Sequence, residues 1–209
     1  MSSSPDMIRI LSVDDHALLR KGVAAVVNAE LDMKLVAEAA GGAEAVEKFR
    51  VHRPDVTLMD IQIPGLDGIE TTSRILSEFP DARIIVLTTS SGDAQVKRAL
   101  RAGARAYILK GHDRELVETV HAVMAGRKRI PPEVAAELAE HATDEELSAG
   151  EIEVVRLIAA GNSNKQIADR LFVAEATIKS RVTNILSKLN ASDRAHAVTI
   201  ALKRGIFEL

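Results

Sequence analysis

The chain contains no cysteine and very few aromatic residues. The absence of cysteine excludes disulfides, thiolate zinc sites and cysteine nucleophiles, and it is compatible with a reducing compartment. Aromatic residues make up only 2% of the 209 residues, which argues against base stacking on single-stranded nucleic acid. No run of about 18 apolar residues occurs, so no membrane span or membrane partner is expected. The first six residues lack the basic and apolar regions of a secretory signal, so a cytoplasmic protein is expected.

The net charge of −3 is mild and by itself gives no indication of nucleic-acid binding. It hides a split along the chain. Residues 147–209 carry nine Lys and Arg against six Asp and Glu, a net of +3, which leaves 18 against 24, a net of −6, for residues 1–146. An acidic module followed by a basic one indicates two functions.

In the first 126 residues, short apolar runs alternate with segments of helical spacing. The runs are rich in β-branched residues and predict buried strands. They are Ile8–Val13, Lys34–Ala37, Val56–Met59, Ile84–Leu87 and Ala106–Leu109. The alternation predicts an α/β domain, in which a five-stranded parallel sheet is covered by helices on both faces.

Polar side chains follow four of these five strands. They are Asp14 and Asp15, Asp60, Thr88 and Thr89, and Lys110. Open parallel sheets bind ligands beyond the carboxyl ends of their strands, and Mg²⁺ relieves the mutual repulsion of clustered carboxylates. A carboxylate beside Mg²⁺ can attack phosphorus, while a Lys ammonium and a hydroxyl share the charge of the transferred group. The cluster therefore contains the groups needed for phosphoryl transfer to Asp60. Each of these residues alone is also common at the end of a strand, and it is their joint occurrence that favours a functional site.

Four segments carry a resemblance to a known family. They are Val13–His16, Leu58–Ile61, Pro64–Gly68 and Tyr107–Lys110. In this order and spacing they resemble the receiver domain of bacterial two-component response regulators, over about residues 7–126. The resemblance implies a doubly wound, flavodoxin-like fold.

The resemblance also implies roles for individual residues of the acidic site. Asp60 would be the phosphoacceptor. Asp15, Asp60 and the main-chain carbonyl of Gln62 would bind Mg²⁺, with Asp14 in the same acidic pocket. Thr88 and Lys110 would contact the phosphoryl group.

A switch role for Tyr107 is implied as well, as the aromatic side chain that rotates and reports phosphorylation. Two positions depart from the family pattern. Ile63 replaces the usual Met before the loop proline, and Gly111 follows Lys110 where many receivers have proline. The first change is a mild apolar replacement, and the second permits unusual backbone angles.

A break in the pattern follows the fifth predicted helix. Pro131 and Pro132 cannot continue a helix but can start one, so residues 133–141 are expected to form a short helix. The polar, acidic stretch 143–146 follows. We therefore expect a receiver domain over 1–126, a linker with a short helix over 127–146 and a second domain over 147–209.

From Leu147 onward four helical segments and no strands are expected. Ile178, Val182, Ile185 and Leu189 recur at spacings of 4, 3 and 4, which predicts the buried stripe of a helix over about 175–189. Its opposite face carries short polar side chains and lysines. Joined to the preceding helix by residues 172–174, it forms a helix-turn-helix in the geometric sense. Spacing alone fits a solvated polar face equally well.

Sequence motifs favour the DNA-binding alternative. The segments Leu147–Glu151, Ala160–Ala168, Ala176–Lys179 and Asn184–Leu189 resemble the LuxR-type DNA-binding domain. Joined to a receiver, this domain resembles the NarL/FixJ class of response regulators. The resemblance implies that base edges are contacted by Lys179, Ser180 and Thr183, and phosphates by Asn164, Lys165, Thr177, Asn184 and Lys188. It also implies dimerisation on DNA through the last helix.

Three residues of this domain depart from the family pattern. Gly150 replaces the usual Arg before the glutamate, so any ion pair made by that Arg is lost. Arg181 replaces the usual His. Ala174 replaces the usual Ser at the start of the recognition helix and has no side-chain oxygen to cap it.

The predicted function is a phosphorylation-dependent transcriptional regulator rather than an enzyme. Its expected partners are a sensor histidine kinase, promoter DNA and a second copy of the chain, with RNA polymerase as a further candidate. Two alternatives remain open. One is a Mg²⁺-dependent phosphohydrolase, which also uses a nucleophilic Asp, and the other is a DNA-binding regulator whose receiver is inert or senses another signal.

Overall fold

The computed structural model describes residues 7–88, 92–111, 113–141 and 144–207. The chain divides into two compact units, one formed by Met1–Ser90 and Val96–Ala135, the other by Ser91–Gln95 and Ala136–Leu209. No helix within the described ranges is long and apolar enough to cross a membrane. The division expected at residues 126 and 147 stays a prediction.

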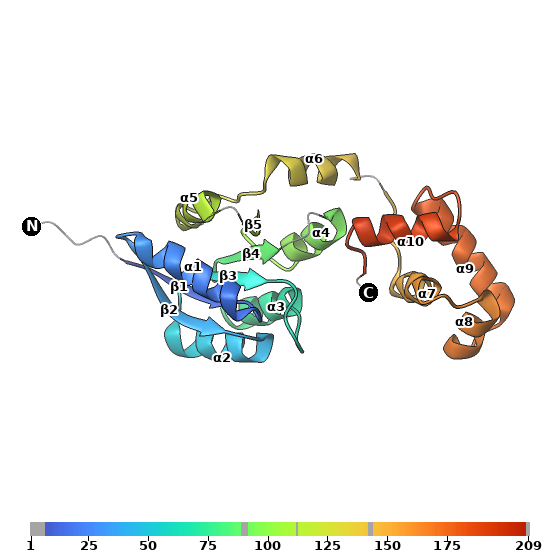
Figure 1. The fold of residues 1–209 in the computed structure, drawn as a ribbon, viewed down its shortest axis with the longest axis horizontal. Helices are drawn as coiled ribbons and strands as arrows, with labels where there is room; N and C mark the ends of the chain where they lie inside the picture. Colours follow the sequence, from blue (N-terminus) through green and yellow to red (C-terminus); the bar gives the residue numbers. More distant parts are fainter. Residues whose placement is uncertain (1–6, 89–91, 112, 142–143, 208–209) are drawn as a thin grey trace, which may run out of the picture. The chain divides into compact units, whose positions relative to one another are not determined.

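The first unit is built on a five-stranded parallel sheet (Figure 1). Its strands are β1 (Ile8–Val13), β2 (Met33–Ala39), β3 (Val56–Asp60), β4 (Ile84–Thr88) and β5 (Ala106–Leu109). They lie in the order β2-β1-β3-β4-β5. All five predicted strands are confirmed. Because every strand is parallel, all their carboxyl ends meet at one edge of the sheet.

Helices cover both faces of this sheet. They are α1 (Ala17–Ala29), α2 (Gly42–His52), α3 (Gly68–Glu78), α4 (Asp93–Arg101) and α5 (Asp113–Met124). Ile10 and Leu58 pack with side chains of α1 and α5. Their strand neighbours Leu11 and Met59 pack with α2 and α3 on the other face. Successive residues of β1 and β3 thus pack into two separate cores, which is why these strands are mostly apolar and do not alternate regularly between apolar and polar residues.

The segment after α5 pairs with the edge of the sheet. Arg129 forms a parallel bridge to Ala106 in β5. Its carbonyl accepts the Tyr107 N–H at 3.1 Å, and its own N–H donates to the Arg105 carbonyl at 3.2 Å. Its guanidinium lies 2.9 Å from the Glu118 carboxylate in α5. We call this pairing the Arg129 bridge. Helix α6 (Pro132–Glu140) then provides the short helix expected at residues 133–141.

Four helices form the body of the second unit, as expected. They are α7 (Ala149–Ala159), α8 (Asn164–Leu171), α9 (Glu175–Lys188) and α10 (Arg194–Lys203). Their apolar stripes meet in one core, which includes Val154, Ile167 and Ile178.

Helix starts in this unit follow from local sequence. Ser148 and Ser163 each form a capping box with the residue three positions later, at the start of α7 and α8. Ala174, at the start of α9, makes no side-chain cap, as predicted. Helix α9 therefore leaves more of its first N–H groups to water than the other two helices do.

Candidate functional site

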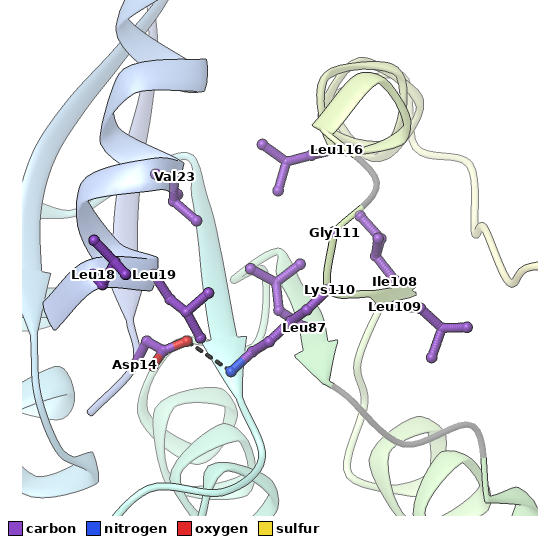
Figure 2. Close-up of a pocket in the computed structure, with 11 residues that line it drawn as sticks. Asp14, Leu18, Leu19, Val23, Leu87, Ile108, Leu109, Lys110, Gly111 and Leu116 are labelled. Carbon is purple, nitrogen blue, oxygen red and sulfur yellow. Dashed lines mark ion pairs between the residues drawn. The ribbon is translucent and has the colours of Figure 1, made fainter. Parts of the chain in front are cut away.

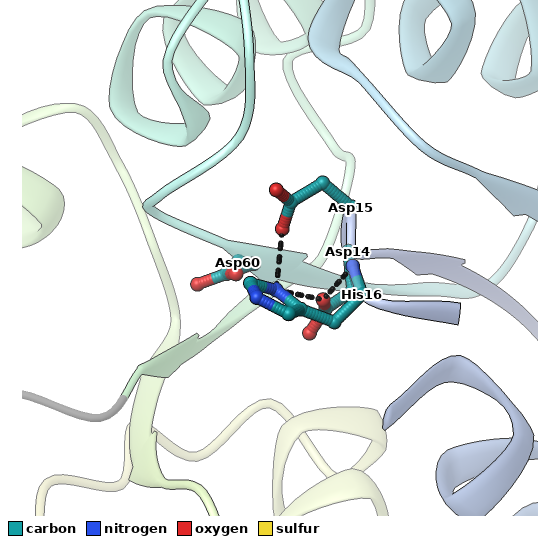
Figure 3. Close-up of side chains that lie close together, drawn as sticks. All are labelled: Asp14, Asp15, His16 and Asp60. Carbon is teal, nitrogen blue, oxygen red and sulfur yellow. Dashed lines mark hydrogen bonds and ion pairs between the residues drawn. The ribbon is translucent and has the colours of Figure 1, made fainter. Parts of the chain in front are cut away.

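Three carboxylates converge at the carboxyl ends of β1 and β3, as the sequence predicts (Figure 3). Asp14 and Asp15 directly follow β1, and Asp60 is the last residue of β3. Together with His16 they offer four ligand atoms that lie within 4.8 Å of one another. Asp14 and Asp60 are buried, whereas Asp15 and His16 are exposed. The cluster therefore has a buried floor and an open rim.

Lys110 joins two of these carboxylates. It follows β5, and its Nζ lies 2.8 Å from Asp14 Oδ2 and 2.7 Å from Asp60 Oδ2. Figure 2 shows the Lys110 side chain reaching across the sheet edge towards Asp14. The pocket holds one ammonium against three carboxylates, so it keeps an excess of negative charge that suits a divalent cation.

Burial governs the ionisation of Asp60. It raises the pKa of the Asp60 carboxyl above its ordinary value, and the hydrogen bond from Lys110 offsets this effect only in part. Burial alone would lower the pKa of the Lys110 ammonium, but its hydrogen bonds to Asp14 and Asp60 raise that pKa overall. The site thus holds a charged lysine beside a carboxylate whose ionised form is disfavoured until further positive charge arrives.

The loop after β3 passes close against Asp60. A Cβ on Gly68 would lie 1.9 Å from the Asp60 carbonyl oxygen, so only glycine fits there. The Gly68 N–H donates to the Ile61 carbonyl at 3.0 Å. The Gln62 N–H donates to Asp60 Oδ1 at 3.3 Å, which places the exposed Gln62 directly beside the carboxylate. This close passage fixes the position of Asp60 relative to the loop.

Thr88 and Tyr107 lie on the two strands that complete the site. Thr88 ends β4 and is buried, and its carbonyl accepts the Lys110 N–H at 2.8 Å. Tyr107 in β5 is fully buried. The described backbone contains no cis peptide bond, and Gly111 has a φ of 95°, which glycine adopts without strain. Thr89 lies outside the described residues.

Two residues near the cluster received no role from the sequence. His16 Nδ1 lies 2.7 Å from Asp15 Oδ1, and Arg20 donates from its guanidinium to the Asp14 carbonyl at 2.6 Å. His16 immediately follows the two aspartates and Arg20 lies one helical turn further on, so their spacing is a signal that could have identified them.

A cleft of about 150 Å³ opens beside Asp14 and Lys110 (Figure 2). Its walls are apolar and include Leu18 and Leu19 of α1 and Leu116 of α5. Leu18 is 82% exposed. An apolar surface thus borders the acidic cluster.

Helix α9 buries the predicted stripe and exposes the predicted polar face. Ile178 and Ile185 are fully buried and Leu189 nearly so, while Val182 is half-buried. Most of the residues expected to contact DNA are exposed, namely Lys165, Thr177, Lys179, Ser180, Thr183 and Asn184, whereas Asn164 and Lys188 are half-buried. The exposed set forms a surface rich in hydrogen-bond donors, which suits phosphates and base edges.

Lys188 has partners within the second unit. Its Nζ is 3.0 Å from the Glu151 carboxylate and 3.3 Å from the Glu146 carbonyl. Glu151 therefore has a cationic partner even though Gly150 stands where the family usually has Arg. Burial alone would raise the pKa of the Glu151 carboxyl, but hydrogen bonds from Ser148 and Lys188 lower it overall.

Comparisons with known proteins define the class. Residues 10–121 match the family described as the response regulator receiver domain. Residues 145–201 match the family of bacterial regulatory proteins of the luxR type. The chain belongs to the response regulators that join a receiver domain to a LuxR-type DNA-binding domain.

Individual relatives support the same assignment along the whole chain. The transcriptional regulatory protein LiaR of Bacillus subtilis is 39% identical over 204 residues, which cover 93% of this chain and 97% of LiaR. The solved structure of the response regulator ChrA of a heme-sensing two-component system is 34% identical, with a TM-score of 0.58, and covers 97% of this chain and all of that one.

A third relative was solved together with DNA. The structure of RcsB from Salmonella enterica serovar Typhimurium, bound to a promoter in the presence of the phosphomimetic BeF₃⁻, is 26% identical with a TM-score of 0.71. The match covers 92% of this chain and 97% of that one.

Proposed function

We propose that this protein is a transcriptional regulator switched by phosphorylation of Asp60. The observation that carries the proposal is the position of Lys110, which contacts both Asp14 and Asp60 at the carboxyl ends of three different strands. An ammonium held there can neutralise a phosphoryl group on Asp60.

In the proposed transfer, a carboxylate oxygen of Asp60 attacks the phosphorus of a phosphorylated histidine or a small acyl phosphate. The bond from phosphorus to the donor nitrogen or oxygen breaks, and the donor atom keeps the electron pair. Lys110 and Thr88 then contact the phosphoryl oxygens on Asp60. Because Thr88 and Tyr107 lie on the adjacent strands β4 and β5, a shift of Thr88 towards Asp60 would change the packing around Tyr107.

The donor set at this site fits Mg²⁺. Asp15, Asp60 and the Gln62 carbonyl would hold the cation, with Asp14 beside them, and oxygen is the ligand that Mg²⁺ prefers. When bound, Mg²⁺ supplies positive charge that offsets the negative charge of the carboxylates and the incoming phosphoryl group.

The proposed output is binding of promoter DNA by the α9 surface. Lys179, Ser180 and Thr183 would contact base edges, and Asn164, Lys165, Thr177 and Asn184 would contact phosphates. The RcsB structure combines a promoter with a phosphomimetic, which supports this coupling. We propose dimerisation through α10, whose Val198, Ile200 and Leu202 are only half-buried.

We further propose a sensor histidine kinase as the physiological phosphodonor and the cytoplasm as the site of action. RNA polymerase is a candidate partner at the promoter. In this proposal the protein gains one phosphoryl group and does not turn over a separate substrate. That distinguishes it from a Mg²⁺-dependent phosphohydrolase with a nucleophilic Asp.

Incubation with acetyl phosphate and Mg²⁺, followed by intact mass spectrometry, tests the first step. The wild type should gain one phosphoryl group, and Asp60→Asn should gain none. Lys110→Ala retains the acceptor and should be phosphorylated more slowly. A wild type that stays unmodified would favour a regulator with an inert receiver, whereas continuous release of phosphate from simple phosphate esters would favour the phosphohydrolase.

Genomic footprinting with the phosphorylated protein identifies target DNA for the second step. The phosphorylated wild type should bind a recovered promoter fragment more tightly than Asp60→Asn does. Equal binding by the two proteins would contradict the proposed switch.

A further inference from the structure

Asp15 is held less firmly than the other two carboxylates of the site. Asp14 accepts hydrogen bonds from Lys110 and from the His16 N–H, the latter at 2.8 Å. Asp60 accepts from Lys110 and the Gln62 N–H. In the described parts of the chain, the Asp15 carboxylate has a single partner, the His16 imidazole, whose Nδ1 lies 2.7 Å from Asp15 Oδ1. Figure 3 shows this contact at the open rim of the cluster.

We propose that His16 is a positioning residue for the divalent cation, and that it acts by orienting Asp15. An ionised carboxylate only accepts hydrogen bonds, so the hydrogen of this contact resides on His16 Nδ1. The bond restrains a side chain that is 35% exposed and would otherwise rotate in water. With one oxygen held by His16, the carboxylate stays within reach of Asp60. The proposal rests on the proposed function, because it assigns a role towards the cation of that same site.

The His16 side chain is separable from the local structure. The imidazole is 66% exposed, so its burial contributes little to packing. Its bond to Asp14 comes from the backbone N–H, which any residue except proline supplies. His16 precedes the first residue of α1 and its side chain forms no cap there. Replacing the ring therefore removes its short contact with Asp15, at 2.7 Å, and a longer one of 3.5 Å between Nδ1 and Asp14 Oδ1.

Removing a contact that orients a metal ligand typically lowers cation affinity by about 10- to 100-fold. We therefore expect His16→Ala to weaken cation binding by about tenfold or more. His16→Asn should retain most of the affinity, because the Asn amide nitrogen occupies the position of Nδ1 and also donates. His16→Gln places its donor one bond further out and should behave like His16→Ala.

The measurement is titration of the full-length protein with Mn²⁺, with unbound Mn²⁺ followed by electron paramagnetic resonance and Mg²⁺ added as competitor. No phosphodonor is present, so the readout is binding alone. Lys21→Ala, a change at an exposed position of α1, which directly follows His16, is the matched control and should bind like wild type. Thermal unfolding in EDTA checks that all variants are folded.

The outcomes separate the two proposals. If wild type and His16→Ala bind the cation equally well, the positioning role is wrong and the proposed function stands. If His16→Asn loses as much affinity as His16→Ala, the imidazole does more than donate to Asp15, and the role assigned here is also wrong. If wild type itself binds neither Mn²⁺ nor Mg²⁺, the proposed function fails, and this inference fails with it.

Discussion

At the scale of single residues, the burial of the Asp60 carboxylate lowers the stability of the folded first unit. Burial raises the pKa of its carboxyl above the ordinary value of 3.8. At neutral pH the unfolded chain therefore holds an ionised Asp60 more easily than the folded chain does. This loss of folding stability is complete above the raised pKa of folded Asp60, and it disappears as the pH decreases towards 3.8.

Asp60→Asn should therefore raise the melting temperature of the first unit at pH 7 in EDTA. The rise follows from removing a buried charge whose ionised form is disfavoured in the folded unit. The gain should shrink as the pH approaches 4. Differential scanning calorimetry checks this, with Asp15→Asn as a partly exposed comparison that should change less. A gain that persists unchanged at low pH would show that charge is not its cause.

Gly68 sets the position of Asp60 by lacking a side chain. Gly68→Ala would place a methyl group against the Asp60 carbonyl, at 1.9 Å before relaxation. Forced overpacking costs about 1–3 kcal/mol, and the shift it causes is transmitted directly to the acceptor. We expect lower stability together with slower phosphorylation by acetyl phosphate.

Gly22→Ala is the matched control for that change. Gly22 lies inside α1, and its added Cβ would meet nothing within 4 Å. There the same substitution should stabilise the helix by about 0.5–1 kcal/mol and leave phosphorylation unchanged. Urea unfolding and intact mass spectrometry measure both effects, and similar results for the two glycines would refute the steric argument.

At the scale of elements, the start of α9 can be improved. Ala174 has the extended backbone of a helix cap, with a φ of −68° and a ψ of 144°, but no capping oxygen. Ala174→Ser should stabilise α9 by about 1 kcal/mol, whereas Ser163→Ala should destabilise α8 by a similar amount because it removes a capping box.

Hydrogen exchange of the α9 amides in the full chain measures the first effect. The chain has no tryptophan, and its single tyrosine lies in the first unit, so intrinsic fluorescence does not monitor this helix. Slower exchange is expected in Ala174→Ser. Unchanged exchange would mean that water already satisfies the first N–H groups of α9.

The strands, and the site formed where they end, could be predicted from the sequence. Individual contacts between residues that are distant in the sequence could not. Runs such as Ile84–Leu87 identify strands, and parallel topology then brings Asp14, Asp60 and Lys110 together. Lys188 and Glu151, which form an ion pair between two helices, are 37 positions apart in the sequence. No periodic pattern in the sequence indicates such a pair. The Arg129 bridge is equally hidden, because one bridging residue is too short to read as a strand.

At the scale of the whole molecule, the salt dependence of DNA binding distinguishes lysines that contact phosphate from those that do not. Each phosphate contact adds about 0.9 to the slope of log affinity against log salt concentration. Lys165→Ala should reduce the slope by about 0.9 for each bound copy. Lys188→Ala should leave the slope unchanged, because Glu151 already neutralises Lys188.

Fluorescence anisotropy over a series of salt concentrations, with a promoter fragment recovered by footprinting, measures the slopes. A reduced slope for Lys188→Ala would mean that the ion pair opens on DNA and that the sequence-based expectation for Lys188 was correct. In the intact chain, the net charge of −6 on residues 1–146 opposes the attraction of DNA by the net charge of +3 on residues 147–209.

The Arg129 bridge also covers part of a sheet edge that could otherwise pair with another copy of the chain. Strand β5 lies at the edge of the sheet, and an unpaired edge strand is a template for pairing with another chain. The backbone of Arg129 occupies part of that edge. A receiver fragment that ends at residue 126 would expose it, so such a fragment should self-associate more readily than one that ends at residue 135. Arg129 lies within the first unit, so we expect this short segment after α5 to limit aggregation of that unit.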